Sequence, residues 1–156
     1  MEVEHVKKNK KSIYLDVCVL SRPFDDQSLL RIRLETEAAN LILSKVKNEE
    51  YRLVVSPIHW EEIKAISGNF ERIELQERLQ ALGEFVTVDL AAARNRAEEL
   101  YDLKFGVADA AHFAFAEQCG AEFISCDDSL LKKCLRHNIK VWCGTPVAFC
   151  EKEGLR

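Results

Sequence analysis

Carboxylates from separate parts of the chain stand within or directly next to segments that are rich in apolar residues. They are Asp16 within residues 13–20, Glu61 and Glu62 within 57–66, Asp109 near the start of 107–119, and Asp127 and Asp128 directly after 121–126. A carboxylate in an apolar environment is unfavourable unless it is protonated, paired or bound to a cation. Asp16 interrupts a hydrophobic segment, which points to a chemical role.

Carboxylates that share one pocket repel one another. At about 4 Å and an effective dielectric of about 20, each like-charged pair costs roughly 4 kcal/mol. Such a cluster takes up protons or binds a hard divalent cation, and Mg²⁺ and Mn²⁺ prefer oxygen ligands. A cation in that position can activate water against a phosphodiester bond. The acids therefore predict a metal-dependent phosphodiester hydrolase if the fold brings them together.

Each acid taken alone also has a structural explanation. Asp109, Asp127 and Asp128 stand where helices are expected to begin, and an acid there stabilises a helix by about 1 kcal/mol. Glu61 and Glu62 taken alone are expected on the surface. Adjacent residues of a helix point about 100° apart, so only one of these two can face a pocket.

Short apolar stretches alternate with longer amphipathic ones along the chain. The apolar stretches predict strands at residues 13–20, 52–56, 85–88, 121–126 and 139–143. The amphipathic stretches predict helices at residues 29–48, 57–66, 70–82, 89–103, 107–119, 127–138 and 145–154. Strands that alternate with helices form parallel sheets covered on both faces. The sequence therefore predicts an α/β protein, a three-layer α/β/α sandwich with a mainly parallel, roughly five-stranded sheet.

This fold would bring the acids together. Ligands of an open parallel sheet bind beyond the carboxyl ends of its strands, and the acids follow or border those ends. Arg22, in a predicted loop at residues 21–26, is a candidate contact to a phosphate. Glu35 and Glu37, on the predicted helix 29–48, could border the pocket, but by default they are expected to face solvent.

Length and charge limit the alternatives. The 156 residues suffice for a single domain over 1–156, with a flexible charged N-terminus at 1–11. A formal net charge of −4 gives no general attraction to nucleic acid or to anionic membranes. No apolar stretch approaches the ~20 residues that cross a bilayer, and the charged N-terminus lacks a signal-peptide pattern. We therefore expect a cytoplasmic protein without membrane attachment.

The sequence contains 6 cysteines and no C-x-x-C pair. Most of them lie inside apolar segments, which is typical of buried thiols in a reducing compartment. Neither a disulfide framework nor a zinc site is expected.

Three segments resemble PIN-domain proteins: "YLDVCVLSRPFD", "VSPIHWEEI" and "GVADAAHFAFAEQCGAEFISCDDSLLK". In that family the first strand carries an Asp in a D-x-N-type motif, and a Glu follows in a Ser-containing strand-to-helix segment. A second Asp opens a "DAxHxAxA" helix, and a third follows an "FxTxD" strand. By motif, these positions are Asp16, Glu62, Asp109 and Asp127. The similarity extends over nearly the whole chain, and residues 106–131 are its most specific part.

The resemblance implies an endoribonuclease that depends on Mg²⁺ or Mn²⁺, with those four acids as catalytic residues and metal ligands. It implies an RNA substrate and, for the toxin of a VapBC-type toxin–antitoxin pair, an antitoxin protein as partner. Family members also often form homodimers. Ser125, His112 and Asp128 are expected as secondary contacts around the acids. Cys18 also belongs to this surrounding set, but it stands where the family commonly has Asn, and a thiol is a poorer hydrogen-bond partner.

Two alternatives remain open from the sequence. A phosphatase with an aspartyl nucleophile needs a second Asp two positions after the first, and Cys18 occupies that position. A catalytically inactive PIN-like module that acts through a protein or RNA partner would keep the fold without using the acids. The sequence leaves open RNA against DNA, the number of metal ions and the existence of an antitoxin.

Overall fold

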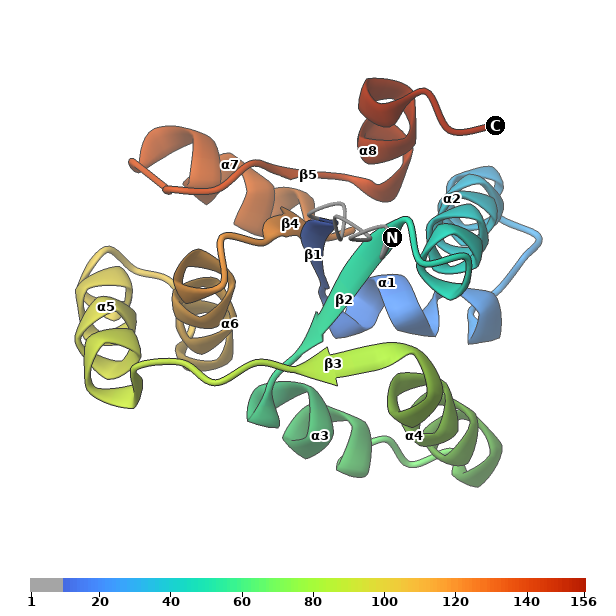
Figure 1. Cartoon of the computed structure of the whole chain (residues 1–156). Helices are drawn as coiled ribbons and strands as arrows, with labels where there is room; N and C mark the ends of the chain where they lie inside the picture. Colours follow the sequence, from blue (N-terminus) through green and yellow to red (C-terminus); the bar gives the residue numbers. More distant parts are fainter. Residues whose placement is uncertain (1–9) are drawn as a thin grey trace, which may run out of the picture.

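The computed structural model describes residues 10–156 (Figure 1). Five parallel strands form one sheet in the order β3-β2-β1-β4-β5, with β1 at its centre. The strands are β1 (Lys11–Leu15), β2 (Tyr51–Val55), β3 (Gly83–Phe85), β4 (Glu122–Ile124) and β5 (Cys143–Gly144). Residues 1–9 of the predicted flexible N-terminus lie outside the described residues, and Lys11 begins β1.

Helices cover both faces of this sheet (Figure 1). The core on one face includes α1 (Val17–Ser21), α2 (Leu30–Lys47), α3 (Pro57–Lys64), α4 (Asn69–Leu82) and α8 (Pro146–Glu153). The core on the other face includes α5 (Leu90–Asp102), α6 (Val107–Gln118) and α7 (Asp128–Arg136). A short 3-10 turn (Arg22–Phe24) follows α1.

The alternation of side chains along β1 divides the core into two. Ile13 and Leu15 pack with α2 on one side, whereas Tyr14 between them packs with α6 on the other. All three side chains are completely buried, as expected for the central strand of a parallel sheet. The predicted three-layer α/β/α sandwich is therefore confirmed.

The strand predicted at residues 13–20 is wrong in its second half. β1 ends at Leu15, and residues 17–21 form α1, with Asp16 at the N-cap position. Val19 and Leu20 are buried in this short helix as fully as they would be in a strand. Over so few apolar residues, hydrophobic pattern does not separate a buried strand from a buried helical turn.

The third strand also lies elsewhere than predicted, at Gly83–Phe85 instead of residues 85–88. It pairs with β2, and Gly83 lies opposite Leu53. A Cβ atom on Gly83 would lie 2.2 Å from Val55 Cγ2 and 2.7 Å from the carbonyl oxygen of Leu79. Glycine usually weakens a strand, but here it permits a close approach of β2 and α4. The last strand, predicted at residues 139–143, is reduced to Cys143–Gly144.

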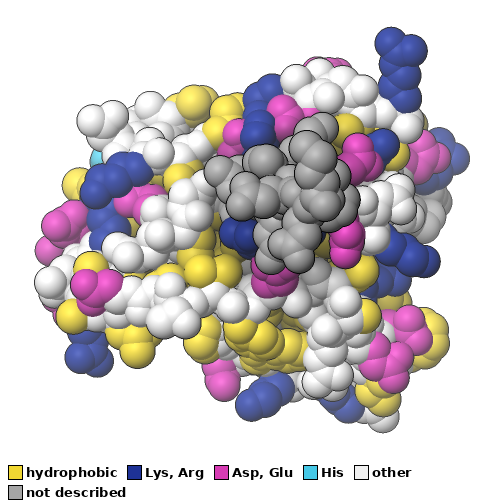
Figure 2. Space-filling model, in the orientation of Figure 1, with side chains coloured by type: hydrophobic (Ala, Val, Ile, Leu, Met, Phe, Trp, Pro, Cys, Tyr) yellow, Lys and Arg dark blue, Asp and Glu magenta, His cyan; other side chains and the backbone are white. Residues whose placement is uncertain are grey.

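The surface mixes both signs of charge. Figure 2 shows Lys and Arg side chains interspersed with Asp and Glu side chains over the face that it displays. Among residues 10–156, no helix has both the length and the apolar character needed to cross a membrane. All six cysteines lie in this described part of the chain and are free thiols.

We expect Gly83→Ala to lower the free energy of unfolding by about 1–3 kcal/mol, because the added methyl group overpacks the contact between β2 and α4. Urea unfolding measures this change. The matched control is Gly68→Ala at the start of α4, where the nearest atoms would be 3.9 Å away. The control should change stability by less than about 0.5 kcal/mol. Equal stability of the two variants would contradict the described packing.

Candidate metal centre

The candidate site lies at the carboxyl ends of β1 and β4, which are adjacent in the sheet. Strands are added on one side of β1 up to β3, and the chain then returns to place β4 on the other side. Such a switch point leaves a crevice beyond the strand ends in α/β sheets. Asp16 directly follows β1, and Ser125 directly follows β4.

Asp16 is held by a hydrogen bond from the neighbouring strand end. Its side chain makes no cap hydrogen bond to α1 although it occupies the N-cap position. Instead, the Ser125 hydroxyl donates to Asp16 Oδ2 at 2.9 Å, and Ser125 Oγ accepts the backbone N–H of Asp127 at 3.1 Å. Asp16 is only 8% exposed, so this carboxylate is largely removed from water. The buried hydroxyl of Ser125 thus fixes one oxygen of Asp16 and leaves the other available.

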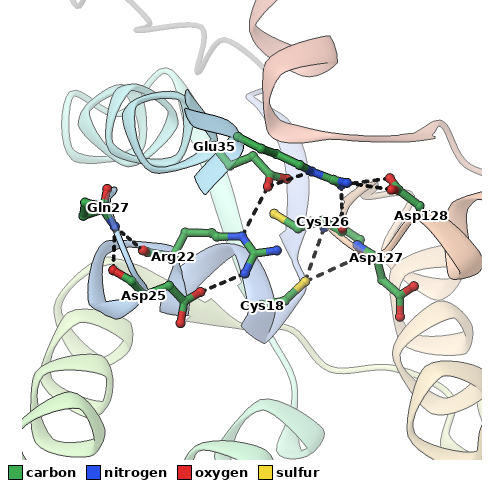
Figure 3. Close-up of polar contacts among 10 residues, drawn as sticks. Cys18, Arg22, Asp25, Gln27, Glu35, Cys126, Asp127 and Asp128 are labelled. Carbon is green, nitrogen blue, oxygen red and sulfur yellow. Dashed lines mark hydrogen bonds and ion pairs between the residues drawn. The ribbon is translucent and has the colours of Figure 1, made fainter. Parts of the chain in front are cut away.

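Cys18 supports the same strand end through its thiol. Its Sγ accepts the backbone N–H of Cys126 at 3.3 Å and lies 3.5 Å from Ser125 Oγ. Figure 3 shows the Cys18 sulfur directed from α1 toward the segment that contains Cys126 and Asp127. The thiol therefore links α1 to the end of β4. Cys18 occupies the position at which the family commonly has Asn.

Glu62 reaches the site from α3 and forms a hydrogen-bonded pair with His112 of α6. Its Oε1 accepts from His112 Nε2. Glu62 is about half-buried, whereas Glu61 is exposed and lies 3.6 Å from Lys64. Burial alone would raise the pKa of Glu62, but the hydrogen bond from His112 outweighs it and lowers the pKa. The structure thus directs Glu62, and not Glu61, toward the site.

Asp109 stands in the first turn of α6 and is half-buried. Burial raises its pKa, and the negative charges of Asp16, Asp127 and Glu62 raise it further. His112 has the opposite effect on this pKa. Asp109 therefore lies within electrostatic reach of the three other predicted acids, and no hydrogen bond within the described residues offsets its charge.

Three of the side chains can approach one cation. One ligand atom each of Asp16, Glu62 and His112 lies within 4.8 Å of the other two. Two of these donors are carboxylate oxygens, which suit Mg²⁺ and Mn²⁺. The half-buried carboxylate of Asp109 adds negative charge that a cation would offset. The chemistry of this donor set therefore fits a hard divalent cation.

A family model described as PIN domain matches residues 13–134. The chain belongs to the PIN domain family. The match covers β1 through most of α7, so it includes every acid of the candidate site. Members of this family are typically nucleases and components of toxin–antitoxin pairs.

Solved structures share the fold of this PIN domain. The crystal structure of FitAcB from Neisseria gonorrhoeae is 19% identical, with a TM-score of 0.52 over 86% of this chain and 97% of that chain. The structure of FitAB bound to an IR36 DNA fragment is 20% identical, with a TM-score of 0.54 over 86% and 95%. The crystal structure of PAE2754 from Pyrobaculum aerophilum is 14% identical, with a TM-score of 0.51 over 98% and 97%. At these identities the likeness concerns the fold alone. No curated protein matches the chain significantly.

The two acids after β4 have different surroundings in this PIN domain. Asp127 caps α7, because its Oδ1 accepts the backbone N–H of Leu130 at 3.1 Å, yet its charge still acts on Asp109. Asp128 binds the guanidinium of Arg31 through both oxygens, at 2.7 and 2.9 Å. Figure 3 shows the carboxylates of Asp127 and Asp128 pointing in different directions. Asp128 is therefore engaged with Arg31 and is not brought into the acid cluster.

The prediction that Glu35 faces solvent is wrong, whereas Glu37 is exposed as predicted. Glu35 is buried, and its Oε1 lies 3.3 Å from Arg22 Nε and 3.2 Å from Arg31 Nε. Arg22 also donates to Asp25 at 2.8 Å (Figure 3). Its guanidinium is therefore already engaged by two acids.

The helical spacing contained the signal for the burial of Glu35. This residue stands three, four and seven positions before Ala38, Ala39 and Ile42, and all of them are buried on one face of α2. Residues at this spacing share one helix face. The charge of Glu35 had suggested a solvent-exposed position. Pairing with the guanidinium groups of Arg22 and Arg31 allows its carboxylate to be buried.

Three further polar residues beneath the site were not predicted from the sequence: Tyr14, Ser56 and His59. Tyr14 Oη contacts His112 Nδ1 and lies 2.6 Å from Ser56 Oγ. His59 Nδ1 accepts the backbone N–H of Ser56 at 3.0 Å, and its Nε2 donates to the carbonyl oxygen of Leu15 at 2.7 Å. Burial and the nearby His112 lower the pKa of His59 to about 4, so His59 is neutral. The Ser-x-x-His spacing at a helix start resembles a capping box and was the available signal.

We expect Asp109→Asn to stabilise the metal-free protein at neutral pH. The raised pKa means that the folded state holds the Asp109 proton more tightly than the unfolded state does. The contribution of this group to stability therefore decreases as the pH rises from the unfolded pKa through the folded one. The gain from Asp109→Asn should be full above that window and absent below it.

Urea unfolding in EDTA across this pH range measures the difference. The control is Glu37→Gln on the exposed face of α2, which should stay within about 0.5 kcal/mol of the wild type. An Asp109→Asn protein that is less stable than the wild type at about pH 7 would show that the acids do not repel one another.

Proposed function

We propose that this PIN domain is an endoribonuclease that depends on Mg²⁺ or Mn²⁺ and hydrolyses RNA phosphodiester bonds. The observation that carries the proposal is the approach of Asp16 and Glu62 at the switch point of the sheet, where one carboxylate oxygen of each lies within 4.8 Å of the other. The raised pKa of Asp109 supports it, because uncompensated negative charge collects at that place.

The residues of the chain have separate tasks in this proposal. Asp16, Glu62 and Asp109 would hold the cation through carboxylate oxygens, and Asp127 would complete the acidic set from the start of α7. Ser125 orients Asp16 through its hydroxyl. A bound divalent cation supplies Lewis acidity to the phosphate and lowers the pKa of water. The protein contributes a partly buried arrangement of acids.

The alternative of an inactive binding module is less well supported. A module that acts only by docking has no need for a buried carboxylate such as Asp16, which is costly to keep without a ligand. The phosphatase alternative lacks its second acid, since Cys18 instead binds the backbone N–H of Cys126.

An antitoxin protein partner and a homodimer are part of the same proposal. One of the solved structures with this fold is that of FitAB bound to an IR36 DNA fragment. By analogy, this chain would act in the cytoplasm as the toxin of a pair. Co-expression with the product of the neighbouring gene, followed by size-exclusion chromatography, would establish the partner.

We expect Glu62→Gln to reduce Mn²⁺-dependent cleavage of single-stranded RNA on the order of 100-fold or more, since even supporting contacts of a metal site are worth about 10–100-fold. The matched control is Glu61→Gln, one position earlier on the exposed side of α3. Cleavage is followed on a labelled RNA with and without EDTA.

The control should cleave at the wild-type rate. Full activity of Glu62→Gln, or activity of the wild type that persists in EDTA, would contradict the proposed metal-dependent mechanism. Equal loss in both variants would show that the helix, and not the carboxylate, is required.

A further inference from the structure

A continuous chain of buried polar groups leads from the sheet to Glu62. It begins at the carbonyl oxygen of Leu15 and continues through His59, Ser56, Tyr14 and His112 to the Glu62 carboxylate. The side chains of its four inner members are at most 1% exposed. Buried polar groups need hydrogen-bond partners, and a fully paired chain is rigid.

Two backbone groups, the carbonyl oxygen of Leu15 and the N–H of Ser56, set the tautomer of His59. A carbonyl oxygen can only accept, so His59 Nε2 carries the proton that is donated to Leu15 at 2.7 Å. A backbone N–H can only donate, so His59 Nδ1 accepts from Ser56 at 3.0 Å and has no proton. The lone pair of His59 Nδ1 is thus already used.

The hydroxyl proton of Ser56 is therefore directed to Tyr14. Ser56 Oγ lies 2.6 Å from Tyr14 Oη but 3.3 Å from His59 Nδ1, which already has a donor. Burial raises the pKa of Tyr14 well above its ordinary value, so the phenol keeps its proton. With its oxygen accepting from Ser56, Tyr14 donates that proton to His112 Nδ1.

The direction of this chain decides the role of His112. Because Nδ1 accepts from Tyr14, the ring proton of His112 is on Nε2 and is donated to Glu62 Oε1. A protonated Nε2 has no lone pair to offer a cation. Among the hydrogen bonds of the described residues, Glu62 Oε2 accepts none. This second oxygen is therefore the one that could bind a cation.

From this geometry we propose that His112 is a positioning residue and not a metal ligand: Tyr14, Ser56 and His59 lock its Nε2–H tautomer, and His112 in turn holds Glu62 Oε1 so that Oε2 meets the divalent cation. The inference rests on the proposed metal-dependent function. It assigns a task to four residues that hold no substrate and no metal themselves.

Two substitutions of His112 separate positioning from packing. The amide nitrogen of Gln reaches about as far as imidazole Nε2 and can donate to Glu62, whereas the shorter Asn matches Nδ1 and reaches only Tyr14. Both variants remove the same buried ring, so both should lose similar thermal stability. Calorimetric titration of the full chain with Mn²⁺ should show a dissociation constant within about 5-fold of wild type for His112→Gln and about 10–100-fold weaker for His112→Asn.

The tautomer gives a readout that does not depend on activity. In the histidine-labelled wild type, ¹⁵N NMR should show Nε2–H and an unprotonated Nδ1 for both His59 and His112, and addition of Mg²⁺ should leave the His112 Nε2 proton in place. Tyr14→Phe keeps the ring but removes the hydroxyl. This variant should shift part of His112 to the other tautomer and weaken Mn²⁺ binding several-fold, and it serves as the test if the His112 variants do not fold.

The outcomes are distinguishable. A wild type that binds Mn²⁺ while His112→Asn binds it equally well overturns the positioning role alone. Loss of the His112 Nε2 proton on addition of Mg²⁺ overturns it as well, because His112 would then be a ligand. A wild type that binds no Mn²⁺, as Asp16→Asn is expected to behave, overturns the proposed function and with it this inference.

Discussion

The repulsion among carboxylates at the carboxyl ends of β1 and β4 is the constraint on which the site depends. A negative charge that is removed from water is tolerated when it is hydrogen-bonded or balanced by a cation. The chain provides hydrogen bonds for some of these acids, from Ser125 to Asp16 and from His112 to Glu62. Asp109 has no such donor among the described residues, and its pKa is raised by burial and by its acidic neighbours. A divalent cation would remove the charge that the hydrogen bonds leave uncompensated.

The arginines near the site do not take over this task. Arg22 is paired with Asp25 and Glu35 (Figure 3). Arg31 is paired with Glu35 and Asp128. These pairs join α2 to the turn after α1 and to the start of α7, so they fix the border of the site. Within residues 10–156, neither arginine forms an ion pair with Asp16, Glu62 or Asp109. A protein that needed only a neutral, stable strand end would gain from placing a guanidinium among Asp16, Glu62 and Asp109.

The sequence was sufficient for the fold because alternation of apolar and amphipathic segments is a property of every βαβ unit. It was insufficient at short elements: residues 17–21 are as apolar as a strand, and only their packing shows that they form α1. Among the proposed site residues, Asp16 and Asp109 were named because acids near strand ends and helix starts stand out, whereas Glu62 was preferred to Glu61 only through its place in the family motif. The burial of Glu35 was not anticipated, although its helical spacing from Ala38, Ala39 and Ile42 contained the signal, because its partner Arg22 lies on another element. The pairing of Asp128 with Arg31, 97 positions apart, left no local pattern to recognise.

Tyr14 shows why the supporting residues were harder still to recognise. By sequence it is a core aromatic residue of a buried strand, and by packing it remains one, stacked on Phe123 with ring centroids 5.6 Å apart. Its hydroxyl, however, lies between Ser56 and His112, so the packing of the ring sets the position of a hydrogen bond beneath Glu62. Close-packed interiors transmit small displacements. The core on the α6 face therefore has two tasks, since the contacts that stabilise the sheet also determine how Glu62 is presented.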